Sequence, residues 1–187
     1  MRVIPAEIPE VLLIEPDVHG DVRGFFLETF HAGRYAEHGI TGPFVQDNHS
    51  RSVQGTVRGL HLQVARPQAK LIRVIAGEIF DVAVDVRVGS PTFGRWVGVR
   101  LSAESFRQYY IPEGFAHGFS VLSPVAEIEY KCTDLYDPEG QLGLAWNDPT
   151  LNIPWGVDTP VLSDRDRANP TIREAMDHLP RYTVSEP

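Results

Sequence analysis

An arginine, a histidine and a lysine fall within thirteen residues of an acidic chain, as Arg58, His61 and Lys70. Each stands at the start or the edge of a segment that reads as a β-strand. Histidine takes up and releases a proton near neutral pH, and two nearby cations can hold an anion. The spacing therefore predicts a pocket for an anionic substrate in which His61 moves protons.

A histidine that acts as a base needs a partner that fixes its tautomer. Asp166 is a candidate carboxylate for His61, although the pairing is not visible in the sequence. In the run 128–132, alternate side chains should face inward, and Tyr130 is one of them. Its hydroxyl would then reach the interior. Simple packing is the commonest role of a buried tyrosine, so a packing role and a chemical role for Tyr130 both stay open.

Length and charge limit the function. The 187 residues predict a single domain over 1–187, and one cysteine excludes an internal disulfide. With no apolar stretch typical of a signal peptide or a membrane span, we expect a cytoplasmic protein. A net charge of −8 disfavours contact with nucleic acid or membranes. A small anion could still be held by clustered cations, for which the candidates are Arg23, Arg58, Lys70, Arg165 and Arg167.

Short apolar runs separated by Gly, Pro and Asp are typical of an all-β barrel or sandwich. The clearest hairpin is expected from strands at 70–76 and 79–88 around a Gly77-Glu78 turn. In its second arm Asp81 and Asp85 alternate with apolar residues, so one face should be core and the other polar. Elsewhere we expect strands at 11–14, 24–30, 97–101, 109–111, 118–122 and 125–133, a turn at 17–21, a loop at 51–56, and short helices at 31–38 and 171–179.

Residues 112–117 read Pro-Glu-Gly-Phe-Ala-His and resemble the second motif of the cupin superfamily, which projects a histidine, here His117, into a jelly-roll barrel. Cupins that bind metal usually carry His-x-His in their first motif. The corresponding positions here read His61-Leu62-Gln63, and glutamine is a poor ligand for a transition metal. We therefore expect a metal-free barrel used for organic acid–base chemistry.

A more specific resemblance is to the dTDP-4-dehydrorhamnose 3,5-epimerase family of metal-free cupins. It rests on seven segments in family order, 21–28, 46–50, 55–61, 111–119, 130–134, 146–149 and 162–166. The resemblance implies a cupin-type jelly roll with short flanking helices, including one near the C-terminus. It also implies a homodimer that exchanges N-terminal strands and epimerises dTDP-4-keto-6-deoxy-D-glucose to dTDP-4-keto-L-rhamnose without a cofactor.

By the same resemblance, His61 is the base held by Asp166, Tyr130 is the acid on the opposite face of the sugar, and Lys70 lies beside the keto oxygen. Epimerisation next to a ketone needs acid–base groups on both faces of the ring and a positive group near the enolate. The resemblance also assigns a set of substrate-binding residues, with Phe26 and Glu28 contributed by the partner: Arg23, Phe26, Glu28, Gln46, Asn48, Arg58, His117, Tyr136 and Arg165.

Three departures from the family pattern leave open an enzyme that inverts only C3. The loop from His61 to Lys70 looks one residue short, Leu135-Tyr136 replaces two aromatics, and Gln141 replaces an acidic residue. A metal-dependent cupin enzyme and a non-catalytic sugar-binding cupin are further alternatives. Neither explains the whole series of motifs.

Overall fold

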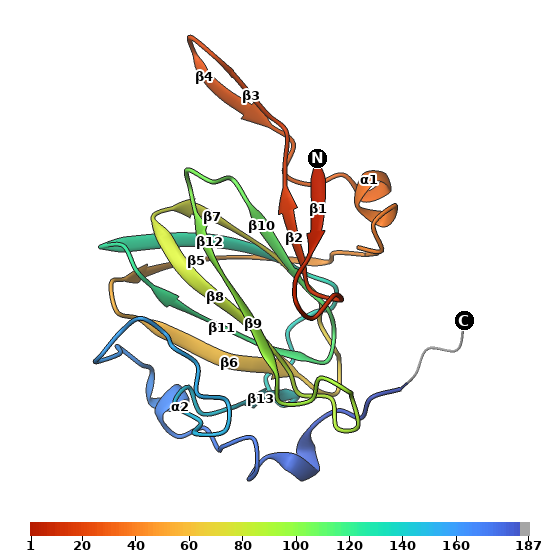
Figure 1. Cartoon of the computed structure of the whole chain (residues 1–187), viewed down its shortest axis with the longest axis vertical. Helices are drawn as coiled ribbons and strands as arrows, with labels where there is room; N and C mark the ends of the chain where they lie inside the picture. The colour runs from red at the N-terminus through yellow and green to blue at the C-terminus, as the bar shows by residue number, and fades with distance from the viewer. Residues whose placement is uncertain (184–187) are drawn as a thin grey trace.

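Two antiparallel sheets carry most of the regular structure in the computed structural model of the chain, which describes residues 1–183 (Figure 1). The first sheet has the order β1 (Arg2–Pro5), β2 (Leu12–Glu15), β10 (Gln108–Ile111), β7 (Lys70–Ala76), β12 (Val125–Cys132) and β5 (Gln46–Val53). The second has the order β13 (Gln141–Gly143), β6 (Val57–Gln63), β11 (Phe115–Val121), β8 (Glu78–Asp85) and β9 (Trp96–Ser102). The prediction of an all-β jelly roll is confirmed.

Both faces of the second sheet are buried, and this explains the alternation in β8. Ile79 and Ala83 pack toward the first sheet, with Ile72 of β7 and Ile128 of β12. The opposite face, which includes Val82, packs against apolar side chains of the C-terminal segment. In Figure 1 this blue segment runs along the outside of the barrel. The aspartates of β8 therefore lie on the interior face of the barrel, and their burial makes them candidates for the site.

The predicted hairpin between β7 and β8 is wrong. Strand β7 pairs with β10 and β12, whereas β8 pairs with β9 and β11 in the other sheet. Gly77, the single residue between the two strands, has a φ of 77°, and a Cβ there would lie 2.1 Å from the carbonyl oxygen of Val125. One residue is too short to close a hairpin. It forms a corner through which the chain passes from one sheet to the other.

Three local predictions also need correction. The expected turn at 17–21 contains β3 (Val18–Asp21), which pairs with β4 (Gly24–Leu27). The polar sequence of β3 does not alternate between apolar and polar residues, so it did not predict a strand. Backbone hydrogen bonds to β4 hold the segment extended. The expected loop at 51–56 begins inside β5, which β12 holds by backbone pairing. The expected helix at 171–179 is a series of turns that ends in a 3₁₀ helix, Met176–His178, since so short a helix lacks stability of its own.

Two short α-helices flank the sheets. Helix α1 (Ala32–Ala36) lies within the predicted 31–38 and is capped by the side chain of His31. Helix α2 (Asp164–Arg167) was not expected. Within residues 1–183, the structure contains no helix long and apolar enough to cross a membrane.

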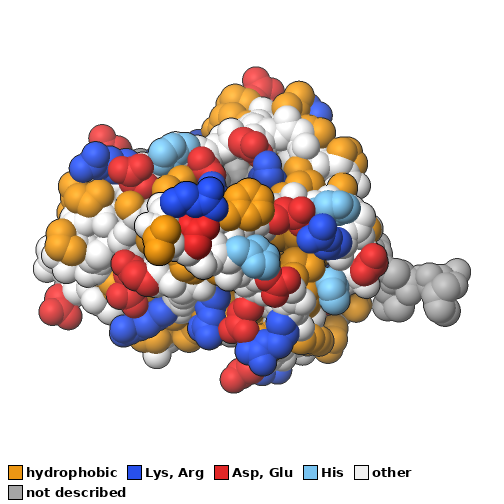
Figure 2. Space-filling view, turned by 90° about the horizontal axis from the view of Figure 1, so that it is seen from above, with side chains coloured by type: hydrophobic (Ala, Val, Ile, Leu, Met, Phe, Trp, Pro, Cys, Tyr) orange, Lys and Arg blue, Asp and Glu red, His pale blue; other side chains and the backbone are white. Residues whose placement is uncertain are grey.

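The β3–β4 hairpin projects beyond the barrel (Figure 1). Its apolar side chains are exposed, with 104% relative exposure at Val22, 62% at Phe25 and 71% at Phe26. Figure 2, which looks down on this end of the molecule, shows apolar side chains at the surface among charged ones. Apolar exposure of this kind marks a contact surface.

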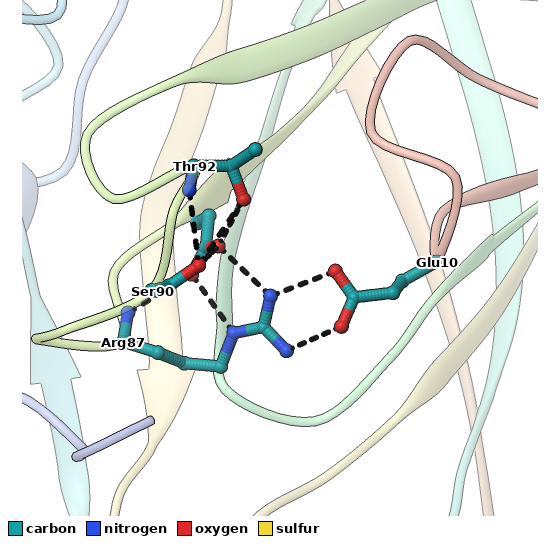
Figure 3. A network of polar contacts seen from close by, with 5 residues as sticks. Glu10, Arg87, Ser90 and Thr92 are labelled. Atoms are coloured by element: carbon teal, nitrogen blue, oxygen red, sulfur yellow. Dashed lines mark hydrogen bonds and ion pairs between the residues drawn. The ribbon is translucent and has the colours of Figure 1, made fainter. Parts of the chain in front are cut away.

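A buried ion-pair network ties the N-terminal loop to the end of β8 (Figure 3). Arg87 contacts Asp85 at 2.8 Å and Glu10 at 2.7 Å, and its guanidinium lies 4.5 Å from the ring centre of Phe115. The hydroxyls of Ser90 and Thr92 donate to the same Asp85 oxygen. Burial raises the pKa of Asp85, but the bonds from Arg87, Ser90 and Thr92 outweigh it and lower the pKa.

Replacing Arg87 with methionine should lower the free energy of unfolding by about 3–5 kcal/mol, because it leaves a buried carboxylate unpaired. Because the pKa of Asp85 is lower in the folded state than its value near 4 in the unfolded state, the ionised carboxylate stabilises the fold above about pH 4. This contribution is lost as the pH falls through the folded-state pKa. Denaturant unfolding at several pH values should therefore show the deficit shrinking below about pH 4. The exposed pair Arg100–Glu78 supplies the control, since R100M should cost less than about 1 kcal/mol.

Candidate active site

His61 and Asp166 are 105 residues apart in sequence and form a short hydrogen bond. The Nε2 atom of His61 lies 2.6 Å from Oδ1 of Asp166. His61 is carried by β6, and Asp166 lies in α2, where the hydroxyl of the N-cap residue Ser163 accepts from the backbone N–H of Asp166 at 3.0 Å. The helix cap thus fixes the carboxylate in front of the imidazole.

Asp166 is buried, with 4% relative exposure. Burial raises its pKa, but hydrogen bonds from His61, Ser163 and the backbone of Gly59 prevail and lower the pKa of this carboxyl. Asp166 is therefore ionised at neutral pH and accepts only, so the Nε2 of His61 carries the proton. With Nε2 directed at Asp166, Nδ1 is the ring nitrogen of His61 that remains to contact a substrate.

Close approach of β6 to β11 depends on Gly59. Its φ is 111°, and a Cβ there would lie 2.6 Å from the carbonyl oxygen of His117 and 2.7 Å from Cα of Gly118. The absence of a side chain lets the two strands meet with His61 opposite His117 in the register. Both histidines line one pocket.

Tyr130 faces that pocket from the first sheet, whereas His61 faces it from the second. Burial raises the pKa of Tyr130, the neighbouring Cys132 raises it further, and Arg58 lowers it. The net increase keeps the phenol protonated at neutral pH. The site therefore presents an imidazole on one wall and a protonated phenol on the other.

Lys70 and His117 line the same pocket, and a carboxylate that was not predicted for the site lies beside His117. Nε2 of His117 is 3.0 Å from both oxygens of Asp81, and Asp81 is fully buried. Burial lowers the pKa of His117 and of Lys70, while Asp81 acts in the opposite direction on both. The alternation in β8 places Asp81 on the face opposite the apolar residues, but only the structure shows that this face is the barrel interior.

Two adjoining pockets meet at these groups. His61, Lys70, Tyr130 and Gln141 line both. The larger pocket has a volume of ≈ 1310 Å³ with its open mouth, and its polar lining includes Arg51, Ser52, Arg58, His117, Arg165 and Asp166. The smaller pocket has a volume of ≈ 680 Å³ and is lined mainly by amides and aromatic groups, among them Gln46, Asn48, Gln63, Gln68 and Tyr136. One pocket is cationic, and the other is largely neutral.

The structure separates three of the expected binding residues from this site. Arg23 pairs with Asp21 at the tip of the β3–β4 hairpin, Phe26 is exposed on the same hairpin, and Glu28 pairs with Arg34 at 2.9 Å. None of the three lines either pocket of its own chain. The other six, which are Gln46, Asn48, Arg58, His117, Tyr136 and Arg165, do line a pocket.

Each candidate histidine of the metal-dependent alternative has one ring nitrogen, Nε2, bonded to a carboxylate. His61 bonds Asp166, and His117 bonds Asp81. Among residues 1–183 no group of three or more His, Cys, Asp or Glu side chains is arranged to hold a metal ion.

A jelly-roll barrel with a histidine–aspartate pair facing a protonated tyrosine defines an acid–base enzyme of the cupin type. The family model described as dTDP-4-dehydrorhamnose 3,5-epimerase matches residues 5–174. The chain belongs to this family, and it is an isomerase.

Individual relatives agree with this assignment. The dTDP-4-dehydrorhamnose 3,5-epimerase of Pseudomonas aeruginosa is 53% identical over 94% of this chain and 98% of its own length. That of Neisseria gonorrhoeae is 52% identical over 97% of this chain, which spans only 56% of that protein. The crystal structure of dTDP-6-deoxy-D-glucose-3,5-epimerase RmlC from Legionella pneumophila in complex with dTDP-4-keto-L-rhamnose has a TM-score of 0.95 and 52% identity, covering 98% of this chain and 99% of that one.

Proposed function

We propose that the chain converts dTDP-4-keto-6-deoxy-D-glucose to dTDP-4-keto-L-rhamnose by inverting C3 and C5. The observation that carries the proposal is the placement of the His61–Asp166 pair and Tyr130 on opposite walls of one pocket. Inversion requires a proton to leave one face of the ring and another to arrive at the opposite face. The names of the relatives supply the substrate.

In the proposed reaction, Nδ1 of His61 takes the proton from the carbon next to the ketone. The C–H electron pair moves to form the enolate, whose negative charge lies on the keto oxygen. The hydroxyl of Tyr130 then gives its proton to the same carbon from the other face. Exchange with solvent returns a proton to Tyr130 and removes one from His61, so the enzyme is regenerated.

The enolate needs positive charge close to its oxygen, and Lys70 is the proposed source. Lys70 lines the same pocket as His61 and Tyr130. Burial lowers the pKa of Lys70, and the neighbouring Cys132 and Asp81 oppose that shift. Asp81 therefore helps to keep the lysine charged in a region where an unscreened charge is most effective.

The two pockets suit the two ends of a nucleotide sugar. We assign the diphosphate to the cationic side of the larger pocket, near Arg58 and Arg165. We assign the base to the neutral smaller pocket, where Tyr136 offers a half-exposed ring. The ketone would then lie where the pockets meet, beside the groups common to both.

We further propose a homodimer in which each β3–β4 hairpin contributes Arg23, Phe26 and Glu28 to the partner's pocket. The exposed apolar hairpin supports this arrangement, since none of the three residues lines either pocket of the candidate site in its own chain. We also propose that the single domain spans 1–187 and acts in the cytoplasm.

Complementation between two defective variants tests the exchanged hairpin. R23A should raise the KM for the nucleotide sugar about 10- to 100-fold, because a charge-assisted bond to phosphate is lost. When R23A is co-expressed with H61N, half of the dimers should be mixed, and each would contain one intact site. About a quarter of wild-type activity should then return. If the mixture is no more active than R23A and H61N measured separately, Arg23 does not act across the interface.

Proton NMR in deuterated water tests the reaction itself. Incubation with dTDP-4-keto-6-deoxy-D-glucose should exchange the protons at both C3 and C5 and yield an L-configured product that a reductase can trap. Exchange at C3 alone would assign the chain to the 3-epimerases. Absence of exchange at both positions would reject the proposed substrate.

A further inference from the structure

Three glutamine side chains from different segments bond the main chain of one loop, residues 134–137, which lies between β12 and β13. We call them the glutamine clamp. The bonds run from Gln68 Nε2 to the Asp134 carbonyl at 2.7 Å, from Gln63 Nε2 to the Asp137 carbonyl at 3.0 Å, and from the Tyr136 N–H to Gln46 Oε1 at 2.9 Å. The loop is thus held at both ends and in the middle.

The clamp ties this loop to both sheets of the barrel. Gln46 is the first residue of β5 in the first sheet, and Gln63 is the last residue of β6 in the second. Gln68 lies in the segment that joins β6 to β7. All three bonds are made to main-chain atoms, so the side chain of Tyr136 stays available, and its hydroxyl donates to Gln141 at 2.9 Å.

The burial of these amides argues against a role in packing alone. Gln63 is 6% exposed and Gln68 is 9% exposed. Oε1 of Gln63 accepts no hydrogen bond from any residue in 1–183, which costs about 1–3 kcal/mol. An apolar side chain would avoid this cost. The one hydrogen bond that the Gln63 amide makes is to the loop, so holding the loop explains why an amide is present at this position.

The clamp and the proposed active site share the smaller pocket. All three glutamines line it together with Tyr136, and so do His61 and Tyr130. The neutral, amide-rich lining fits an uncharged heteroaromatic ring better than a diphosphate, for which the larger pocket has the arginines. The loop therefore forms the wall against which the nucleoside base would rest.

We propose that the glutamine clamp is a positioning device that fixes the 134–137 loop so that Tyr136 covers the base of the bound nucleotide. This inference rests on the proposed function. The glutamines act on binding through Tyr136 and take no part in proton transfer. Without the clamp the half-exposed loop samples other conformations, and the substrate has to order it on binding.

The test compares Q63L and Q68L with wild type. Loss of one such bond, worth about 1 kcal/mol, should raise both the Kd for dTDP and the KM about fivefold while kcat changes less than about twofold. The control is Q54L, because Gln54 Nε2 donates to the Leu122 carbonyl at 2.8 Å and neither residue lines either pocket. Hydrogen exchange at 134–140 should be faster in Q63L and Q68L and unchanged in Q54L.

A double-mutant cycle shows whether the clamp acts through Tyr136. In a Y136A background, Q63L should have no further effect on the Kd for dTDP. Additive effects would overturn the proposal, and so would unchanged exchange in both clamp variants or a fall in kcat at constant KM. If wild-type protein does not bind dTDP, the proposed substrate is wrong, and the clamp's role in nucleotide binding is overturned with it. In that case, faster hydrogen exchange in Q63L and Q68L would show only that the clamp holds the loop.

Discussion

Replacing His61 with asparagine should reduce kcat by about 10²- to 10⁴-fold, the range expected for removal of a general base. An asparagine amide can still donate to Asp166, so the site should keep its shape and its affinity for dTDP. In deuterated water, the variant should lose exchange at both C3 and C5. Stopped or quenched assays at saturating substrate measure the loss in kcat, and titration with dTDP measures the retained affinity.

A histidine–carboxylate pair outside the site supplies the control. His49 lies 3.1 Å from Glu127 on the outer surface of β5 and lines neither pocket of the site. H49N should therefore leave turnover within about twofold, in the range of ordinary surface changes. Wild-type turnover in H61N would remove His61 from the mechanism and leave the proton transfer to another group.

The interior residues were predictable where a local period carried the information. Alternation along 128–132 placed Tyr130 on the inward face, and the structure places it in the pocket. The same rule applied to β8 put Asp81 on the face opposite the apolar residues, but it could not say whether that face is solvent or barrel interior. That choice depends on which elements cover the sheet, and the covering C-terminal segment lies far along the chain.

Contacts between distant segments were not predictable from local patterns. Asp166 is 105 residues from His61, and the sequence offered it only as a candidate, which the family resemblance then paired with His61. The failed hairpin between β7 and β8 has the same origin, because two adjacent strands look alike whether they pair with each other or turn a corner into separate sheets. The glutamine clamp gave no signal either, since an isolated glutamine in a sequence carries no mark of its partner. In each case the missing information is long-range pairing.

Asp81 connects two parts of the site that the sequence treats separately. It holds the imidazole of His117 through Nε2 and opposes the loss of charge on Lys70. A buried carboxylate with one hydrogen-bonding partner is costly unless a cation lies nearby. Asp81 opposes the lowering of the Lys70 pKa, which agrees with the proposed role of this lysine beside the enolate oxygen.

Replacing Tyr130 with phenylalanine should separate proton removal from inversion. The hydroxyl that returns a proton to the far face is lost, while the His61–Asp166 pair remains intact. We expect the formation of inverted product to fall about 10²- to 10³-fold. Exchange of the C3 proton with deuterated water should persist at a much larger fraction of its wild-type rate, because His61 can return a deuteron to the face from which it took the proton.

The ratio of exchange to inversion is the decisive quantity in this experiment, because a variant that merely loosened the pocket would lower both rates together. Y110F is a suitable control, since Tyr110 is also buried in the first sheet but lines neither pocket. Equal losses of exchange and inversion in Y130F would mean that Tyr130 supports the site as a whole. If inversion is not reduced in Y130F, Tyr130 has only a packing role. Another group on the same wall of the pocket would then donate the proton.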